Sequence, residues 1–537
     1  MIQTEKKSNW KKFLNAKSAF VAAGLLLIFF IALRPPTDPD MGWHLQDGKY
    51  LLEHNFEVAH QDIFSYTMPD FPLIMHEWVT DILMAVAYQE TNLFTLSAIF
   101  ALIVTLAFLL VSLGVNAKIE YRIVAAALGT IASIPVLGVR PQMINLLGLA
   151  LVIYIIFKFR SDSRSKIIYW LPLIFAIWVN LHGGFAVGLF FVAAYLFVET
   201  MKNLIPWGLK RIHKKVEFCP PLTFRTVFFE DCQLVGERIK NSALLEGIGA
   251  LMEKSALAPR RIAKLGGVLA VSSLATLCNP YGWKVYIEVV TTIFDQYAKA
   301  NINEWFPVTA ANPMSYQFLM YLSLLGILLL LNFRKNDYTY LAVCLAFLYL
   351  GLSSWRHMPI FLIVSTPLWV SIAEGLAGKE LISIVRKKWF LAFAILAIFL
   401  VAGQRLTKDV PPGYSVEKIA KDGSYPIGAV NHLKEHPIEG NMFNEYNWGG
   451  FLIWQYPEKK VFVDGRMPSW TFRGQKIFEQ FNKVSQFEGN WREILEKYNV
   501  KFALVYNNPA NRFMFLNAGW KEEYADDLSS IYVRPSM

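Results

Sequence analysis

Eleven apolar runs divide the first 404 residues of the chain. They lie at 18–34, 93–115, 123–139, 142–157, 167–181, 185–200, 266–280, 316–333, 338–353, 359–376 and 389–404. Most of them approach the roughly 20 apolar residues that a helix needs to cross a bilayer. The pattern therefore predicts a polytopic α-helical membrane protein with about eleven spans and a membrane domain that covers 1–404.

The pattern changes after residue 404, where apolar and polar residues alternate in short runs. Strands are predicted at 441–444, 460–466, 500–506 and 529–534. A helix is predicted to begin with 449–454, and another covers 491–498. Such mixing favours a small α/β domain over 405–537 with a mainly parallel sheet. Polar residues at 444–446 and 464–466 follow the carboxyl ends of two predicted strands, where ligands bind open α/β sheets. Alternatively, these residues only form turns and helix caps.

Basic residues are distributed unevenly between alternate connecting segments. With the N-terminus in the cytoplasm, the inside segments carry 29 Lys and Arg, whereas the outside segments before residue 405 carry five. Cytoplasmic loops of membrane proteins are enriched in these residues. The distribution predicts a cytoplasmic N-terminus and an extracytoplasmic 405–537 domain. The formal net charge of +10 is then mainly a topology signal, and we expect no nucleic-acid partner.

Composition narrows the class further. The chain of 537 residues is 54% hydrophobic and 18% charged, with a mean hydropathy of +0.34. Soluble proteins are typically about 25% charged, so a disordered chain is excluded and a water-soluble enzyme is disfavoured. The four cysteines fall in spans or on the inside, where no external disulfide is expected. The basic insertion 201–265 predicts either contact with anionic lipid headgroups or a partner docking site.

Acidic and histidine side chains gather in the first outer segment, 35–92. Asp38 and Asp40 directly follow a span, and His44 stands four residues further on. Two carboxylates in this spacing can hold a divalent cation such as Mg²⁺ or Mn²⁺, or one of them can take a proton from an acceptor hydroxyl. Alternatively, Asp40 only caps the following helix. His76 and Glu77 open a second predicted helix and are candidate cavity residues.

Other outer junctions add basic and imidazole groups. Arg140 and Arg356 stand at outer ends of spans, where guanidinium groups bind one lipid phosphate or simply extend to bulk headgroups. His182 adjoins a Gly-Gly helix break, and His357 follows Arg356. The chain has no phosphate-binding loop, dinucleotide-binding fingerprint or serine-hydrolase elbow, and His76-Glu77 lacks the second histidine of a zinc-protease motif.

This arrangement resembles the GT-C superfamily of integral-membrane glycosyltransferases, which includes protein O-mannosyltransferases, aminoarabinose transferases and oligosaccharyltransferase catalytic subunits. The resemblance rests on many spans, an acidic first outer loop with two helical segments, and an outer tail. Several short strings look like those of a bacterial branch of this superfamily. They are Asp-Pro-Asp-Met-Gly-Trp-His-Leu at 38–45, His-Glu-Trp at 76–78, Asn-Leu-His-Gly-Gly at 180–184, Asn-Pro-Tyr-Gly at 279–282, Trp-Gly-Gly at 448–450 and Asp-Gly-Arg at 464–466. The Trp-Trp-Asp-Tyr-Gly string of oligosaccharyltransferases is absent.

The resemblance implies an inverting transfer of a sugar from a polyprenyl-phosphate donor to an acceptor hydroxyl at the outer face. Asp40 would act as base, Asp38 would position the acceptor or hold a metal, and Arg140 and Arg356 would stabilise the leaving phosphate. His44, His76, Glu77, His182 and His357 would line the cavity. The natural location is a bacterial inner membrane. The alternatives are a flippase or transporter of a lipid-linked precursor, and a polymerase or ligase of surface polysaccharide.

Overall fold

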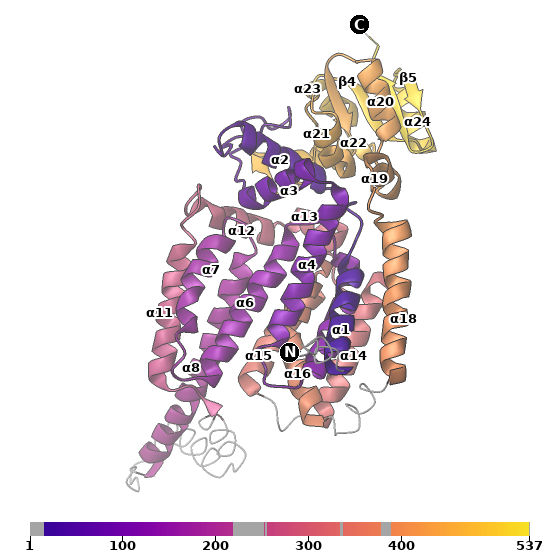
Figure 1. Cartoon of the computed structure of the whole chain (residues 1–537). Coiled ribbons are helices and arrows are strands. Elements are labelled where there is room, and N and C mark those ends of the chain that lie inside the picture. The colour runs from indigo at the N-terminus through magenta and orange to yellow at the C-terminus, as the bar shows by residue number, and fades with distance from the viewer. Residues whose placement is uncertain (1–15, 218–251, 253–254, 333–336, 377–387, 536–537) are drawn as a thin grey trace, which may run out of the picture.

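The computed structural model describes residues 16–217, 252, 255–332, 337–376 and 388–535. Each of the eleven apolar runs falls on a helix, and these helices form one bundle (Figure 1). They are α1 (Ala16–Ala32), α4 (Leu93–Ser112), α5 (Ile119–Ser133), α6 (Gln142–Ser161), α7 (Leu171–Trp178), α8 (Phe185–Glu217), α11 (Pro259–Ala275), α14 (Tyr316–Leu331), α15 (Tyr338–Ser353), α16 (Met358–Leu376) and α18 (Lys388–Gln404).

Six helices in the described part of the chain are long and apolar enough to cross a membrane, and three further apolar helices are shorter. The flanks of the bundle are apolar too, because Leu330, Tyr349 and Phe399 are 82%, 75% and 72% exposed. Such exposed apolar surface suits lipid and not water. The fold is that of a multi-pass membrane protein, whereas the number of eleven spans and their orientation stay predictions.

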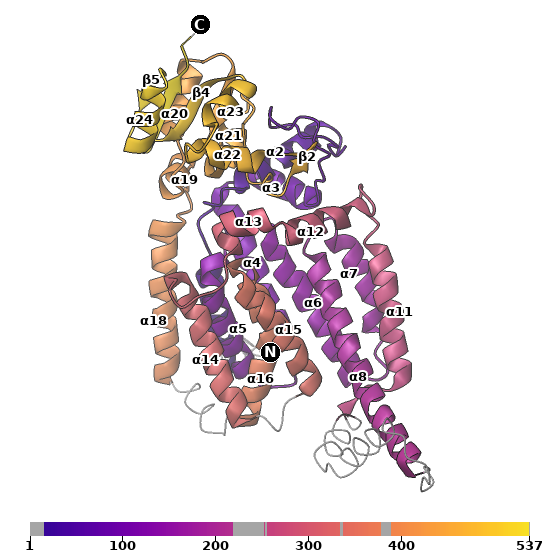
Figure 2. The same ribbon diagram turned by 180° about the vertical axis from the view of Figure 1, so that it is seen from behind.

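A second layer of helices lies across one end of the bundle, as Figure 2 shows from behind. It contains α2 (Met41–Glu53), α3 (Trp78–Glu90), α12 (Lys284–Phe294) and α13 (Gln296–Asn301). The two helical segments expected in 35–92 are confirmed as α2 and α3. Pro39 keeps α2 from extending toward the N-terminus, because a proline disfavours the helical conformation of the residue before it.

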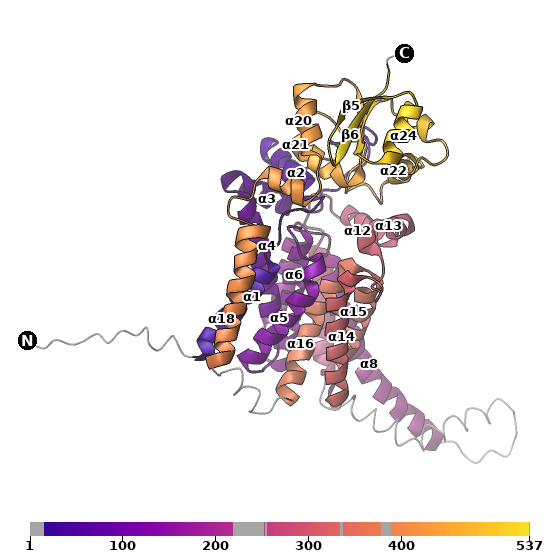
Figure 3. The same cartoon turned by 90° about the vertical axis from the view of Figure 1, so that its right-hand side faces the viewer.

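The tail from residue 405 contains six α-helices and a four-stranded sheet, which confirms its α/β character (Figure 3). The helices are α19 (Val416–Asp422), α20 (Ile427–Glu435), α21 (Gly449–Gln455), α22 (Ile477–Ser485), α23 (Trp491–Lys497) and α24 (Pro509–Asn517). The strands are β1 (Asn441–Asn444), β4 (Val500–Tyr506), β5 (Lys521–Ala525) and β6 (Ser529–Val533), in the order β1-β4-β6-β5.

The prediction of a mainly parallel sheet is wrong. Only β1 and β4 pair in parallel, whereas β4–β6 and β5–β6 are antiparallel. Three residues connect β5 to β6, and so short a connection can only join antiparallel neighbours. The strand predicted at 460–466 is also absent from the sheet. Val461 instead makes a single parallel bridge with Ser65 of the first outer segment.

The tail packs directly on the first outer segment. The Tyr66 hydroxyl donates to the Met442 carbonyl at 2.9 Å, and the Thr67 hydroxyl donates to the Phe462 carbonyl at 2.7 Å. The Phe71 ring stacks on Trp470 with centroids 4.0 Å apart. One buried apolar cluster includes members of both segments. This shared core holds the tail over the outer end of the bundle.

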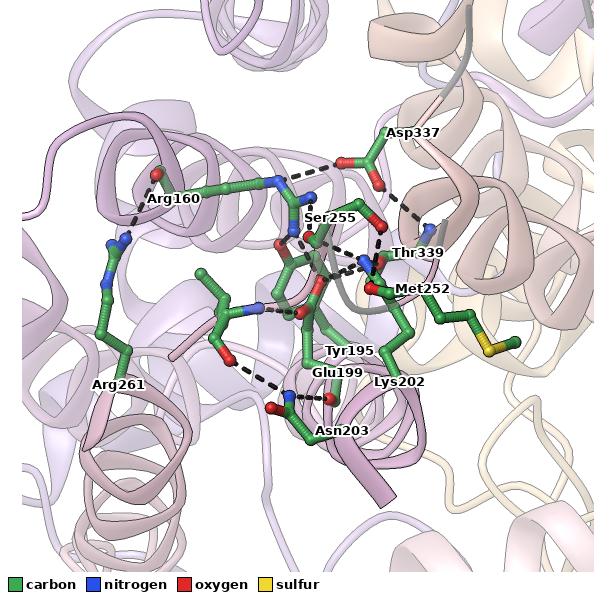
Figure 4. Close-up of polar contacts among 11 residues, drawn as sticks. Arg160, Tyr195, Glu199, Lys202, Asn203, Met252, Ser255, Arg261, Asp337 and Thr339 are labelled. Atoms are coloured by element: carbon green, nitrogen blue, oxygen red, sulfur yellow. Dashed lines mark hydrogen bonds and ion pairs between the residues drawn. The ribbon is translucent and has the colours of Figure 1, made fainter. Parts of the chain in front are cut away.

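A buried ionic network closes the opposite end of the bundle (Figure 4). The Arg160 guanidinium lies 2.6 Å from the Glu199 carboxylate, and the Lys202 ammonium donates to the Ser255 carbonyl at 2.9 Å. Glu199 also accepts from the Leu257 backbone N–H at 2.7 Å. These pairs compensate charges that burial alone would penalise. The bonds to Ser255 and Leu257 hold the end of the basic insertion 201–265 against the bundle. Most residues of the insertion (218–251 and 253–254) lie outside the described residues.

Candidate functional site

A cavity of about 710 Å³ lies between α12, α13, the tail and the end of the bundle that carries α2 and α3. Its walls come from segments more than 400 positions apart in the sequence, including 38–47, 140–146, 182–187, 301–305 and 465–470. All nine predicted site residues line it: Asp38, Asp40, His44, His76, Glu77, Arg140, His182, Arg356 and His357. The fold therefore brings every predicted site residue to one chamber.

Asp38 and Asp40 differ in their partners. Asp38 forms an ion pair with Arg140, which also pairs with Glu304. Asp38 additionally accepts the Asp40 backbone N–H at 2.9 Å. Asp40 stands at the N-cap position of α2 but makes no side-chain capping hydrogen bond. Its Oδ1 accepts instead from the Trp43 indole N–H at 3.1 Å. The geometry thus disfavours the reading of Asp40 as a plain helix cap.

The Asp40 carboxyl is held in an unusual electrostatic setting. Removal from bulk water and the neighbouring Asp38 carboxylate raise the pKa of Asp40 to about 6, against opposing effects of His44, Trp43 and Arg140. A carboxylate with this pKa is a stronger base than an ordinary aspartate and is still ionised at neutral pH. Its second oxygen accepts no hydrogen bond from any side chain or backbone group of the described residues.

Four imidazole and carboxylate side chains surround Glu77. His182 Nε2 lies 2.9 Å from Glu77 Oε1, and His76 Nε2 lies 3.4 Å from the same oxygen. The other oxygen, Oε2, lies 3.5 Å from His44 Nδ1, which is also 2.7 Å from Asp81 Oδ1. Glu77 is therefore the centre of a network that connects α2, α3 and the break between α7 and α8.

Backbone groups orient His182 in this network. The Gly184 N–H donates to His182 Nδ1 at 2.8 Å, and the Asn145 side-chain amide lies 3.0 Å from the same nitrogen. Because Nδ1 accepts, the proton of the neutral ring sits on Nε2, which faces Glu77. The Gly-Gly break is needed here, since a Cβ on Gly184 would overlap the Asn145 amide.

Charge is distributed unequally among these groups. Burial alone would raise the pKa of Glu77, but His182, His76 and His44 hold it well below its usual value. Burial likewise acts to lower the pKa of His76, yet Glu77 raises it to about 9. Burial lowers the pKa of His182. An ionised Glu77 beside a protonated His76 is the expected state near neutral pH.

Arg356 lies on the wall beside the beginning of α6. With the Gln142 amide oxygen turned toward it, Arg356 Nε donates to that oxygen at 3.2 Å. Its guanidinium also lies 5.5 Å from the Trp305 ring centroid, and His357 contacts the same ring edge-on. Among the described residues, no carboxylate lies within ion-pair distance of Arg356. Its positive charge is thus available to an anion in the cavity.

The tail supplies one wall of the cavity. Gly465 abuts Asp40, and a Cβ at this position would overlap the Asp40 carboxylate. Glu445 follows β1, and burial raises its pKa to about 7. Among the polar residues predicted at 464–466, Arg466 connects the tail to the first outer segment. Its guanidinium donates to Asp464 at 2.8 and 2.7 Å and lies 2.9 Å from Asp62.

Sequence reasoning did not single out Asp47 and Asp81 as site residues. Both line the cavity and are only 3% and 1% exposed. Asp47 stands three residues after His44 and Asp81 four after Glu77, so each shares a helix face with a residue that was predicted. This helical spacing is the sequence signal that could have identified Asp47 and Asp81 as cavity residues. Glu304, the second carboxylate partner of Arg140, also lines the cavity.

The cavity is compatible with a divalent cation, because carboxylate and imidazole groups are suitable ligands. The two candidate places differ in quality. Asp38 already contacts the Arg140 guanidinium, which would repel a cation there. His44, Glu77 and Asp81 offer ligand atoms that all lie within 4.8 Å of one another. The pair Asp38 and Asp40 therefore fits a metal less well than sequence spacing suggested.

Comparison with known proteins gives a match of fold without a close relative. No protein-family model and no curated protein matches the chain. An archaeal oligosaccharyltransferase, AglB from Archaeoglobus fulgidus, solved in complex with an inhibitory peptide and a dolichol-phosphate, aligns with a TM-score of 0.51 at 13% identity. The alignment covers 93% of this chain and 70% of that chain.

A second structure of the Archaeoglobus fulgidus oligosaccharyltransferase, in complex with zinc and sulfate, aligns with a TM-score of 0.40 at 11% identity, over 91% of this chain and 68% of that one. The alignment with AglB extends over both the helical bundle and the tail. It confirms, at the level of fold, the likeness to oligosaccharyltransferase catalytic subunits expected from the sequence: the chain has a fold similar to that of AglB.

Proposed function

We propose that this protein transfers a sugar from a polyprenyl-phosphate donor to an acceptor hydroxyl at the outer face of a membrane. One observation carries the proposal. A basic carboxylate, Asp40, and the guanidinium of Arg356, which has no acidic partner among the described residues, line one cavity at the end of a membrane bundle. The complex of AglB with a dolichol-phosphate supports a lipid-linked donor in this fold.

Asp40 is the proposed base. Its pKa of about 6 leaves it ionised at neutral pH and able to remove the acceptor proton as the hydroxyl attacks the anomeric carbon. Its second oxygen is open to an acceptor, while the indole of Trp43 holds the first. Asp38 keeps Arg140 in place beside it. Attack on the face opposite the phosphate would invert the anomeric centre.

Arg356 and Arg140 are proposed to stabilise the departing lipid phosphate. Negative charge builds on the phosphate oxygens as the glycosidic bond breaks, and preorganised cations lower the free energy of that state. Arg356 is held by Gln142 and Trp305, whereas Arg140 is partly neutralised by Asp38 and Glu304. We therefore expect Arg356 to be the stronger phosphate ligand.

The proposed setting is a bacterial inner membrane with the N-terminus in the cytoplasm and the tail outside. The uneven distribution of basic residues supports this orientation. Polyprenyl-phosphate sugars present their headgroups in the outer leaflet, where nucleotide-sugar donors are not expected. A donor could enter the cavity laterally while its lipid tail stays in the bilayer.

The test is an assay of purified protein with a panel of radiolabelled polyprenyl-phosphate sugars and cell-envelope acceptors, scored by released polyprenyl phosphate. Asp40→Asn should abolish release, and Arg356→Gln should lower it by about 100-fold, because a charged transition-state contact is worth roughly 3 kcal/mol. Asp70→Asn and Arg473→Gln are matched controls, since both residues lie in the outer region on exposed positions.

Both controls should keep wild-type rates of phosphate release. Full activity of Asp40→Asn would contradict the assignment of the base. Uptake of the lipid-linked sugar into vesicles without release of lipid phosphate would contradict transfer altogether and would identify a flippase. With polyprenyl-diphosphate sugars added to the panel, release of lipid diphosphate from these donors, and of no monophosphate, would indicate a polymerase or ligase of surface polysaccharide.

A further inference from the structure

The cavity wall formed by α2 and α3 holds buried charged groups that the proposed transfer does not use. His44 and Asp47 lie on α2, Asp81 lies on α3, and Glu77 stands just before α3. The residues are 3%, 3%, 1% and 7% exposed, respectively. Protonated His76 offsets the charge of Glu77. Among the described residues, however, no Lys or Arg lies within ion-pair distance of Asp47 or Asp81, and buried carboxylates are costly without positive charge. The cluster therefore requires protons or a cation.

The spacing of the possible ligand atoms suits a metal ion. His44 Nδ1 lies 2.7 Å from Asp81 Oδ1 and 3.5 Å from Glu77 Oε2. A tetrahedral ion with bonds of about 2.0 to 2.2 Å to nitrogen and oxygen separates its ligand atoms by roughly 3.4 Å. All three atoms lie within 4.8 Å of one another. Small rotations of these side chains would suffice to meet that geometry.

A separate observation points to the same place. Asp47 Oδ1 is buried and has no hydrogen-bond partner. Asp47 is one turn from His44 on the face of α2 that packs against α3. The two backbones meet closely here, because a Cβ on Gly48 would overlap the Asp81 carbonyl. A buried carboxylate oxygen without a hydrogen-bond partner, one turn from His44, needs a proton or a nearby cation.

The surroundings also resemble the outer shell of a metal site. The second oxygen of Glu77 lies 2.9 Å from His182 Nε2, so one carboxylate can ligate through Oε2 while Oε1 is held in place. Outer partners of this kind orient ligands and strengthen metal affinity. Since all four cluster residues line the cavity, an ion can reach them from its aqueous interior.

We propose that His44, Glu77 and Asp81, with the Asp47 carboxyl close by, bind one divalent transition-metal ion that ties α2 to α3 at the cavity wall. One imidazole with carboxylates favours zinc over magnesium, because magnesium prefers oxygen ligands and retains its waters. The ion has a positioning role. It holds Glu77, which in turn orients His182, and it holds His44 and thereby α2, the helix that follows Asp40. The proposal stands independently of the donor and acceptor.

The test measures zinc in the purified full-length protein, prepared with a tag free of histidine and dialysed against a weak chelator. Metal content, zinc affinity and the zinc-dependent rise in Tm are compared for the wild type, Asp81→Asn, His44→Gln, Asp40→Asn and Glu288→Gln. Glu288 is the matched control, because it is a cavity carboxylate outside the cluster. Asp81→Asn keeps the shape of the side chain, so the cluster can fold without its charge.

We expect about one zinc ion per chain in the wild type, Asp40→Asn and Glu288→Gln. Zinc affinity should fall at least roughly 10-fold in Asp81→Asn and His44→Gln, and the rise in Tm should disappear in both. X-ray absorption of the zinc-loaded wild type should show nitrogen and oxygen ligands with a histidine contribution. Absence of zinc in the wild type, or unchanged affinity in Asp81→Asn, would overturn the proposal. Loss of zinc binding in Asp40→Asn, with zinc binding kept in Asp81→Asn and His44→Gln, would also overturn the proposal and would place the ion at Asp38 and Asp40.

Discussion

At the scale of single residues, the site separates two carboxylates that the sequence presents as a pair. The Asp38 carboxylate pairs with Arg140 and accepts the Asp40 backbone N–H, whereas the Asp40 carboxylate accepts the Trp43 indole N–H. The charge of Asp38 is one cause of the raised pKa of Asp40. One aspartate thus tunes the other, and each has a distinct proposed role.

This arrangement predicts a particular pH dependence. Asp40 acts as base only when ionised, so the rate of transfer should rise as the pH climbs through about 6 and then level off. Trp43→Phe removes a hydrogen bond to the charged form, which raises the Asp40 pKa. The acidic limb of kcat/KM should then move to higher pH by about one pH unit, because a hydrogen bond to a charged group is worth roughly 1.5 kcal/mol. An unmoved limb, or one displaced to lower pH, would count against Asp40 as base.

Asp38, Arg140 and Arg356 could be predicted from sequence because they stand close to the ends of apolar runs, where a charged side chain is conspicuous. Asp47 and Asp81 lie within amphipathic helices, where a carboxylate normally faces water. Only the packing of α2 on α3 turns them inward, and that contact depends on Gly48 beside Asp81. Long-range packing of this kind leaves no signal in local periodicity.

At the scale of elements, the contact between α2 and α21 positions the tail over Asp40. Glycines make this contact possible. A Cβ on Gly450 would overlap the Pro39 carbonyl, and a Cβ on Gly42 would overlap the backbone of Gly450. The Gly-Gly string before Phe451 was recognised from the sequence as part of a resemblance, and its physical reason is this close approach of two backbones.

Gly450→Ala should therefore lower both stability and transfer. Forcing a methyl group into a tight contact costs about 1 to 3 kcal/mol, and displacement of α21 from Pro39 would move the chain next to Asp40. Thermal unfolding and the phosphate-release assay measure the two effects. Gly413→Ala is the control, since a Cβ there meets no atom within 4 Å. Equal Tm values and equal rates of phosphate release in the two variants would show that the contact between α2 and α21 does not position Asp40.

The sheet shows where sequence reasoning about elements failed. Strands at 441–444, 500–506 and 529–533 could be predicted from apolar runs, but run length does not encode strand direction. The segment at 460–466 has the apolar pattern of a strand because Val461, Phe462 and Val463 are all fully buried. Their burial comes from packing between the tail and the first outer segment, which local pattern cannot distinguish from burial in a sheet.

At the scale of the whole molecule, the tail and the first outer segment behave as one folding unit. Their shared core includes Phe71 against Trp470 and a buried ion pair of Asp62 with Arg466. Residues 405–537 expressed alone should consequently expose apolar surface and aggregate. A chain that fuses 57–75 to the tail should be more soluble and should unfold cooperatively in circular dichroism. A stable, monomeric isolated tail would contradict this view and would support a separate domain.

Orientation in the membrane is the remaining property of the whole molecule that the proposed function requires. With the native cysteines replaced, Asp70→Cys reports on the outer segment and Lys118→Cys on the connection between α4 and α5; both positions are exposed. A membrane-impermeant maleimide should label Asp70→Cys in intact spheroplasts and Lys118→Cys only after permeabilisation, because basic connections stay in the cytoplasm. The opposite labelling would place the cavity on the cytoplasmic side. A polyprenyl-phosphate sugar of the outer leaflet could not reach Asp40 there, and the proposed donor would have to be abandoned.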